Sequence, residues 1–522
     1  MRRVVLAAGL LVFGALAASR PGRLAAAGAP TFTRDVAPIL YAKCVTCHRA
    51  GEVAPMALLT YLEARPWARA IRDKVSSRQM PPWFADRSVG AFANDPSLSA
   101  AEIATIAQWV DAGAPQGDPK DMPKAPHFAD GWQLGEPDQI IELPEVQIPA
   151  SGSDYFPTPS IAIGLTEDRW VRAIEIRPSN RAVTHHSVIF ATSAGGVFGA
   201  SGLFDILGVW AVGTPPTVYP EGMGRWIRKG QTLRTNLHYH PNGTPQIDRT
   251  RVGLYFGKGE LKKEVVAALA GNLTVSIPAN AENHELRAIY VVDQDISVVS
   301  FFPHMHLRGK DMTMTATYPG GRQETLLRVP GYDFNWQLFY HPKGRVSLPR
   351  GTRLDLVAHY DNSTANRNNP DPSRAVRFGE ASTSEMMFGM FEFTADAGVS
   401  PRPSTDRSRV EALMSSLPAE SAYLVELPFG AQPTPAVLSI PRSGDAWFYM
   451  PSLGMIMPQR IQELQWDEHA FQFGTALLVS GPGGGFYTVT GHVDPDGTIR
   501  GTLRRRGNTM PPSYEFSGAR RR

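Results

Sequence analysis

The two cysteines of the 522-residue chain lie in one pentapeptide, Cys44-Val45-Thr46-Cys47-His48. The Cys-x-x-Cys-His spacing is typical of covalent c-type haem attachment, in which both thiols add to haem vinyl groups and the histidine binds the iron. A redox-active Cys-x-x-Cys pair is the alternative. Because this pentapeptide uses both thiols, any other metal site in the chain has to be built without thiolate.

A haem that carries electrons usually takes a thioether as its second axial ligand. Met56 follows His48 closely, and the short connection makes it hard for its side chain to reach the opposite haem face. Met80 lies farther along, in Met80-Pro81-Pro82-Trp83, where the two prolines hold the loop extended. We therefore predict His48 and Met80 as the axial ligands, with Met56 as the alternative.

The 13 histidines include three close pairs. These pairs are His185-His186, His238-Tyr239-His240 and His304-Met305-His306. On a β-strand, side chains at positions i and i+2 share a face, so a His-x-His can present two imidazoles to one metal. Adjacent histidines can do so only at a strand end or at a β-bulge. One such pair is more often structural, but three in one stretch of chain predict metal binding.

The available ligands favour copper. Blue copper sites need a cysteine, and structural zinc sites usually contain one. Sets of imidazoles, with or without a thioether, suit a copper ion that cycles between Cu(I) and Cu(II). A haem that moves one electron at a time is a sensible partner for such a metal.

Four short motifs occur in a characteristic order. They are Thr184-His185-His186-Ser187, Leu237-His238-Tyr239, His304-Met305-His306-Leu307, and Glu385-Met386 after the Ser/Thr-rich Ser382-Thr383-Ser384. With these motifs, residues 138–395 resemble the type II copper monooxygenases, the peptidylglycine-hydroxylating and dopamine β-hydroxylating family. Members of that family insert one oxygen atom into a C–H bond, and they pair two jelly-roll sandwich domains that each carry one copper.

The resemblance implies two copper sites with different ligands. The first would consist of His185, His186 and His238. The second, catalytic site, where dioxygen and substrate meet, would consist of His304, His306 and Met386. His240 is the rival of His238, and Met387 and Met390 are the rivals of Met386.

The chain departs from the family in two respects. Eukaryotic members contain several disulfides, and this chain has no cysteines for them. Peptide-amidating members grip a carboxylate with an arginine and polar residues at positions that here hold Phe302, Phe388 and Met390. An apolar pocket cannot offset the desolvation of a carboxylate, which argues against peptide amidation and for a relatively apolar small-molecule substrate.

The haem segment resembles the small cytochrome c domains that precede such monooxygenases in some bacterial proteins. We therefore expect the haem to supply electrons to the copper sites, together with a redox partner or small reductant. Two alternatives remain. One is a non-catalytic haem and copper protein that transfers electrons or binds copper. The other is a copper reductase of small nitrogen oxides.

The elements that must position these residues follow from local patterns. Residues 31–120 are predicted to be an all-α, cytochrome c-like domain, with Ser99 and Glu102 forming a capping box and Gly113 ending that helix. After a linker at 115–130, short β-rich segments bounded by turn residues predict antiparallel sandwiches at 138–285 and 286–395. The segments are Trp170 to Ile176, Ser187 to Thr192, Thr232 to Tyr239 and Val298 to Phe302.

A second linker, 395–409, precedes a small β-rich domain over 410–522, which begins with a short helix and contains a hairpin at Asp496-Gly497. The whole chain is thus predicted to be multidomain and mainly β. The role of this last domain does not follow from its sequence.

The charge balance and the N-terminal sequence limit the expected location and partners of the protein. The chain has 52 basic and 49 acidic residues, which gives no indication of nucleic-acid binding. Residues 1–30 are predicted to be a signal peptide, with Arg2-Arg3 before an apolar run and cleavage after Ala17 or Ala27. An uncleaved N-terminal anchor is the alternative, and no other membrane segment is expected. We therefore expect a periplasmic or secreted protein with one haem c, two coppers, dioxygen and an apolar substrate.

Overall fold

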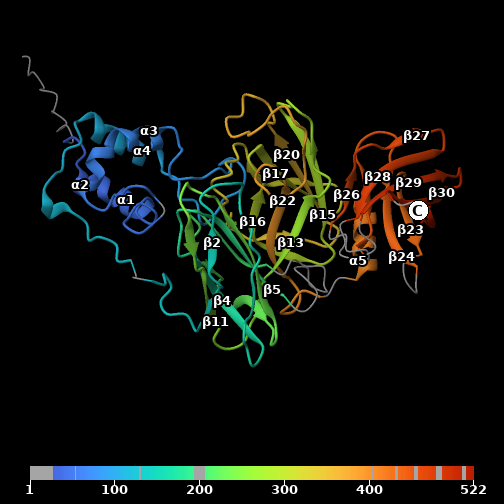
Figure 1. Cartoon of the computed structure of the whole chain (residues 1–522), viewed down its shortest axis with the longest axis horizontal. Helices are drawn as coiled ribbons and strands as arrows, with labels where there is room; N and C mark the ends of the chain where they lie inside the picture. The colour runs from blue at the N-terminus through green and yellow to red at the C-terminus, as the bar shows by residue number, and fades with distance from the viewer. Residues whose placement is uncertain are drawn as a thin grey trace, which may run out of the picture.

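The computed structural model describes residues 28–52, 54–128, 131–192, 206–402, 405–428, 433–451, 457–477, 485–507 and 513–521. Over these residues the chain is mainly β, with several sheets and most of its helices near the N-terminus (Figure 1). Most of the predicted signal peptide, residues 1–27, lies outside the described residues. Within them, no helix is long and apolar enough to cross a bilayer.

The N-terminal helical region packs around its own apolar core. Its helices are η1 (Phe32–Val36), α1 (Ala37–Lys43), α2 (Tyr61–Ala64), η2 (Arg65–Trp67), α3 (Ala68–Ser76), α4 (Ala100–Asp111) and η3 (Pro119–Asp121). The predicted capping box is confirmed, because the Ser99 and Glu102 side chains each bond to the other's backbone N–H at the start of α4. Phe32, Leu40 and Trp109 are fully buried here, and Cys44 packs against this core.

The first β region, residues 139–264, consists mainly of two antiparallel sheets around one core. Its strands are β1 (Gln139–Glu142), β2 (Val146–Ile148), β3 (Ser160–Ala162), β4 (Arg169–Arg177), β5 (Thr184–Thr192), β6 (Ile206–Ala211), β7 (Thr217–Val218), β8 (Met223–Ile227), β9 (Thr232–Tyr239), β10 (Gln246–Asp248), β11 (Arg251–Phe256) and β12 (Lys263–Glu264). One sheet has the order β1-β11-β4-β8-β12, with a parallel β8–β12 pair, and the other β3-β9-β5-β6. Ile174 and Leu254 from one sheet and Ile189 and Leu237 from the other form the core between them.

The second β region, residues 266–395, repeats this arrangement. Its strands are β13 (Val266–Asn272), β14 (Ser276–Ile277), β15 (His284–Val291), β16 (Ile296–His304), β17 (Gly309–Thr317), β18 (Gln323–Val329), β19 (Val346–Leu348), β20 (Arg353–Tyr360), β21 (Val376–Arg377) and β22 (Met387–Ala395). The sheets β13-β22-β16-β19 and β15-β20-β17-β18 enclose a core that includes Phe301, Phe391 and Leu356. Because β13 pairs with β22, the division between the two β regions falls near residue 265.

The C-terminal region has a helix and one nine-stranded antiparallel sheet. The elements are α5 (Asp406–Ser416), β23 (Ala422–Leu427), β24 (Thr434–Ser439), β25 (Ala446–Tyr449), β26 (Gln459–Ile461), β27 (Gln465–Asp467), β28 (Ala470–Leu477), β29 (Gly485–Val493), β30 (Thr498–Arg505) and β31 (Ser513–Arg520). The predicted short helix and the Asp496-Gly497 hairpin between β29 and β30 are both confirmed.

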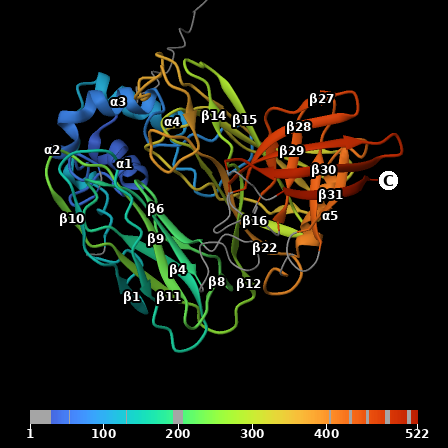
Figure 2. The ribbon, with the colours of Figure 1, turned by 45° about the vertical axis from the view of Figure 1, so that its right-hand side comes forward.

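The two β regions lie at the centre of the molecule, with the helical region on one side and the C-terminal sheet on the other (Figures 1 and 2). A buried ion pair joins the two β regions, Arg225 of β8 to Glu392 of β22, with 2.7 Å between nitrogen and oxygen. An apolar cluster also spans both, including Phe190 and Val209 from the first and Phe302 and Met390 from the second. The edges that carry the histidine motifs are therefore held next to each other.

Candidate metal centre

A β-bulge turns the adjacent histidines of β5 to one side. Strands β5 and β9 pair antiparallel with His186 opposite His238, and the register shifts between Thr184 and His186. His185 is the extra residue of this irregularity, so it does not have to point away from His186 as it would on a regular strand. The sequence-based expectation that these two histidines need a bulge or strand end is confirmed.

Three imidazoles meet at this bulge. His185, His186 and His238 each offer a ring nitrogen within 4.8 Å of the others. The Nδ1 atoms of His185 and His186 lie 3.2 Å apart, close to the spacing of about 3.3 Å between two nitrogens bound tetrahedrally to one metal. The buried Nδ1 of His238 has no hydrogen-bond partner. A buried nitrogen without a partner in such a cluster fits a metal ion.

Burial keeps the imidazoles of His185 and His186 neutral. It lowers the pKa of His185 to about 3, with a further contribution from neighbouring His238. Burial also holds the pKa of His186 well below its ordinary value, again reinforced by the other histidines. A neutral imidazole has a free lone pair, which metal coordination requires. The rings are therefore ready to bind a metal at neutral pH without first losing a proton.

A carboxylate orients the third histidine. Asp154, in the connection between β2 and β3, places Oδ2 3.0 Å from Nε2 of His238. On one face of the His238 ring, Phe156 stacks at 4.4 Å between centroids. His240, the rival ligand, lies beyond the end of β9 with its side chain exposed, and its Nδ1 lies 2.9 Å from the other Asp154 oxygen. The structure thus brings His238, and not His240, into the cluster.

The pKa of Asp154 reflects these contacts. Its burial alone would raise the pKa of the carboxyl group, but hydrogen bonds from His238, Ser382 and His240 outweigh burial and hold the pKa well below its ordinary value. Asp154 is therefore an ionised carboxylate at neutral pH, and an ionised carboxylate is the stronger acceptor for an imidazole N–H.

The second pair of histidines lies at the end of β16. The rings of His304 and His306 are 5.2 Å apart and perpendicular. Each Nδ1 has an oxygen partner: Oε1 of Gln337 lies 2.8 Å from His304, and the carbonyl of Ser384 lies 3.2 Å from His306. These contacts leave both Nε2 atoms available to a metal. Burial lowers the pKa of His304 to about 4 and of His306 to about 3.

Strand register distinguishes among the three candidate methionine ligands that follow Glu385. Residues opposite each other in a sheet share a face, and β22 places Met390 opposite Phe302 and Phe388 opposite His304. Met386 directly precedes β22, and by the alternation of side chains it would share the face of Phe388, the residue opposite His304. Met387 is fully buried in the core on the other face, and Met390 is buried in the apolar cluster between the β regions. The backbone therefore favours Met386 as the thioether.

The carboxylate of Glu385 fixes the turn that carries His306. Its oxygens accept backbone N–H bonds from His306 at 2.9 Å, Arg308 at 2.7 Å and Met386 at 3.3 Å. Burial raises the pKa of Glu385 to about 8, against the opposing effect of these N–H donors and the Arg308 charge. Glu385 thereby ties the His-x-His motif to the segment that contains Met386.

The two histidine groups are neighbours across the contact between the β regions. The rings of His186 and His304 are 6.2 Å apart. Phe334, from the loop between β18 and β19, stacks on His185 at 4.3 Å and lies 5.9 Å from His306. A residue of the second β region therefore packs directly on a histidine of the first.

Aromatic rings surround His304. Phe302 and Phe388 lie nearly parallel to its ring, at 6.4 and 6.3 Å between centroids. Phe339 packs on Phe302 at 4.5 Å. The residues that replace the polar positions of peptide-amidating enzymes thus form an apolar wall next to the second histidine pair.

The haem motif has the geometry expected of a proximal ligand. Nδ1 of His48 lies 3.2 Å from the carbonyl oxygen of Met56, which leaves Nε2 for the iron. Burial raises the pKa of the Cys44 thiol to about 12 and also raises that of Cys47. A redox-active pair needs a lowered thiol pKa, so these thiols argue against the redox alternative. The residues present fit covalent haem.

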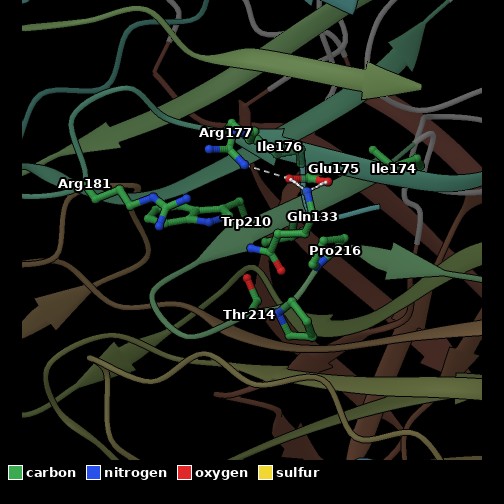
Figure 3. A pocket seen from close by; sticks show the side chains of 11 residues that line it. Gln133, Ile174, Glu175, Ile176, Arg177, Arg181, Trp210, Thr214 and Pro216 are labelled. Carbon is green, nitrogen blue, oxygen red and sulfur yellow. Dashed lines mark hydrogen bonds and ion pairs between the residues drawn. The ribbon is translucent and has the colours of Figure 1, made fainter. Parts of the chain in front are cut away.

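Contacts join the N-terminal helical region to both β regions. In the loop after His48, Glu52 pairs with Arg49 and with Arg181, which lies just before β5. Arg181 and Trp210 line the same small pocket (Figure 3), and Trp210 pairs with Ser187 of β5. Beside this contact is a polar cavity of about 360 Å³ lined by residues of the helical region and of the first β region.

The segment that follows Met80 docks on the second β region. Trp83 packs edge-on against Tyr340 at 4.9 Å. The backbone N–H of Asp86 bonds to the carbonyl of Arg328, and that of Ala93 bonds to the carbonyl of His341, both at 2.8 Å. The segment after Met80 is thus attached to the same β region as His304 and His306.

No protein-family model matches this chain, and a search of curated proteins also finds no match. The interpretation of the site therefore depends on the residues and their geometry.

Sequence reasoning missed the residues that orient the histidines. Asp154, Gln337 and Phe334 come from loops far from the motifs in sequence, and nothing in their local sequence marks them. Glu385 did have a signal, since it belongs to the Glu-Met motif, but its role of accepting backbone N–H groups requires the folded turn.

Proposed function

We propose that this protein is an exported haem- and copper-containing monooxygenase that hydroxylates a C–H bond of a relatively apolar small molecule with dioxygen. In this proposal the haem-binding region supplies electrons, and the two central β regions are jelly-roll domains like those of the type II copper monooxygenases. The main support is the juxtaposition of two groups of imidazoles, with the rings of His186 and His304 6.2 Å apart.

Copper held by His185, His186 and His238 and by His304, His306 and Met386 would supply one-electron chemistry with dioxygen. The overall reaction balances when the C–H bond provides two electrons and the donor provides two more. One oxygen atom then enters the substrate, and the other leaves as water with two protons.

The chain's own residues orient and shield this chemistry. Asp154 and Gln337 orient His238 and His304 through their second ring nitrogens. The rings of Phe302, Phe388 and Phe334 line the space around the imidazoles and exclude water from it. Such walls select an apolar substrate, because a charged group placed against them would lose its hydration without a partner.

The contact at Glu52 supports electron supply to the first site. Arg181, the partner of Glu52, lies four residues before His185, and Trp210 pairs with β5 next to His186. The loop after His48 is therefore bound to the turn that directly precedes the strand of the adjacent histidines.

The test begins with the exported, copper-loaded protein, which should contain one haem and two coppers. After anaerobic reduction, dioxygen is added with a panel of apolar substrates, and incorporation of labelled oxygen is followed by mass spectrometry. We expect one labelled atom per product and reoxidation of the haem only when substrate and dioxygen are both present. His304→Ala should abolish product. Haem reoxidation without labelled product would instead support an electron-transfer protein.

Two variants test the parts of the proposal separately. Phe302→Arg should shift substrate preference towards acidic molecules, and an unchanged preference would refute the pocket assignment. Cys44→Ala/Cys47→Ala should lose turnover driven by a cytochrome reductant. If turnover with a non-haem reductant equals that of the haem-containing protein, the haem is not required as the donor.

A further inference from the structure

Asp154 contacts both β regions at once. It belongs to the first, in the connection between β2 and β3. Its Oδ2 atom lies 3.0 Å from Nε2 of His238 and accepts a hydrogen bond from the hydroxyl of Ser382, which belongs to the second. Ser382 is buried, and the side chain of Asp154 is 11% exposed. A buried charge is costly unless it is hydrogen-bonded, so this carboxylate depends on both partners.

The contact with His238 selects one form of that imidazole. Because the carboxylate can only accept, Nε2 of His238 carries the proton. Its Nδ1 then has the lone pair, and this atom is buried and has no hydrogen-bond partner. Asp154 therefore leaves Nδ1 as the nitrogen of His238 that is free to bind a metal.

The contact with Ser382 reaches the second pair of histidines. Two residues after Ser382, the carbonyl of Ser384 lies 3.2 Å from Nδ1 of His306. The next residue, Glu385, accepts the backbone N–H of His306. One short chain segment thus links Asp154 to His306.

We propose that Asp154 is a positioning residue that fixes the metal-binding form of His238 and latches segment 382–386 of the second β region onto the first histidine cluster. The inference depends on the proposed function in that His238 must be a copper ligand. The latch itself is a property of the polypeptide and exists without metal.

Two measurements separate these parts. Hydrogen exchange with mass spectrometry on the metal-free protein reports the latch through the amides of 382–386. Titration with Cu(II) in competition with a chelator, combined with electron paramagnetic resonance, reports the first site. The variants are Asp154→Asn, Ser382→Ala and, as a control for loss of an aspartate charge in the same region, Asp168→Asn, which lies in an exposed turn.

Asp154→Asn should weaken first-site Cu(II) binding about 10- to 100-fold, the usual effect of removing a carboxylate behind a ligating histidine. It should also shift the copper hyperfine splitting and speed exchange in 382–386. Ser382→Ala should speed exchange in 382–386 and shift the first-site splitting less than Asp154→Asn does, because Asp154 keeps its contact with His238. Asp168→Asn should do neither. Asp154→Glu, which keeps the charge on a longer side chain, is expected to fold and still shift the splitting.

Wild-type affinity and splitting in both Asp154 variants would overturn the positioning role. Wild-type exchange in Ser382→Ala would overturn the latch. If the wild-type protein takes up no copper, the proposed function and the positioning role both fail, and the exchange data still decide on the latch.

Discussion

The buried ion pair between Arg225 and Glu392 offers a direct test of how the two β regions are held together. Their side chains are only 8% and 7% exposed, with 2.7 Å between nitrogen and oxygen. The Glu392 carboxylate also accepts hydrogen bonds from Tyr219 and Ser300. The perturbation is Glu392→Gln, which keeps the shape of the side chain and removes its charge.

The expected loss is large because Arg225 would remain charged and buried without its counterion. Breaking a buried pair from one side costs about 3–5 kcal/mol, equivalent to about two to four orders of magnitude in the unfolding equilibrium. An exposed pair contributes about 1 kcal/mol or less. Glu167, whose pair with Arg169 is exposed, provides the matched control Glu167→Gln.

The pH dependence has a definite sign. Burial raises the pKa of Glu392, but the charge and hydrogen bond of Arg225 outweigh it and hold the pKa below its ordinary value of 4.5. A lowered folded-state pKa stabilises the protein above the unfolded-state pKa, and this stabilisation disappears as the pH falls through the folded-state value. The difference between wild type and Glu392→Gln should therefore be constant from pH 5 to 8 and shrink below about pH 4.5.

Urea unfolding followed by tryptophan fluorescence provides the assay, with the midpoint compared at several pH values. The reasoning is refuted if Glu392→Gln costs no more than Glu167→Gln. It is also refuted if the double variant Arg225→Met/Glu392→Met is as unstable as Glu392→Gln. Replacing both members of a buried pair with apolar residues should recover most of the loss, because no lone charge remains.

Three further predictions concern the sites. Glu385→Gln should lower the free energy of unfolding in urea by about 1–3 kcal/mol, since an amide leaves at least one of three backbone N–H donors without an acceptor. The control Glu380→Gln, at an exposed residue, should change it by less than about 0.5 kcal/mol. Phe334→Ala should lose about 3 kcal/mol or more in thermal unfolding, because the buried ring packed on His185 leaves a cavity. In haem-free protein at pH 8, Cys44 should be alkylated by iodoacetamide about 10³-fold more slowly than in urea, because its pKa of about 12 leaves little thiolate.

Sequence reasoning succeeded where short-range physics decides the outcome. The capping box at Ser99 involves residues only three positions apart, so the start of this helix could be predicted from the sequence. Strand geometry required a strand end or a bulge for His185 and His186 to share a metal, and the register of β5 against β9 is irregular between Thr184 and His186. The strands around Trp170, Thr232 and Val298 also formed within a few residues of the expected ranges.

Long-range pairing decides what local sequence patterns cannot. The family resemblance assigned Met386, whereas the physical reason for setting aside Met387 and Met390 is their burial in apolar clusters of the folded β regions. Asp154 and Gln337 had no signal at all, since each is an ordinary polar residue of a loop until folding brings it to a histidine ring. The docking of segment 83–95 on the second β region is likewise a tertiary contact between residues far apart in sequence.

The arrangement of the contacts bears on how electrons would move between the histidine groups. Arg225–Glu392 and Asp154–Ser382 join the same two β regions at separate places, and Phe334 packs across the contact between them. These three contacts oppose a hinge motion that would separate the two β regions, because such a motion would leave buried polar groups without their partners. The 6.2 Å between His186 and His304 is therefore a property of the packed interior. Electron passage between the groups would then need no domain closure, so turnover limited by this step should depend little on solvent viscosity.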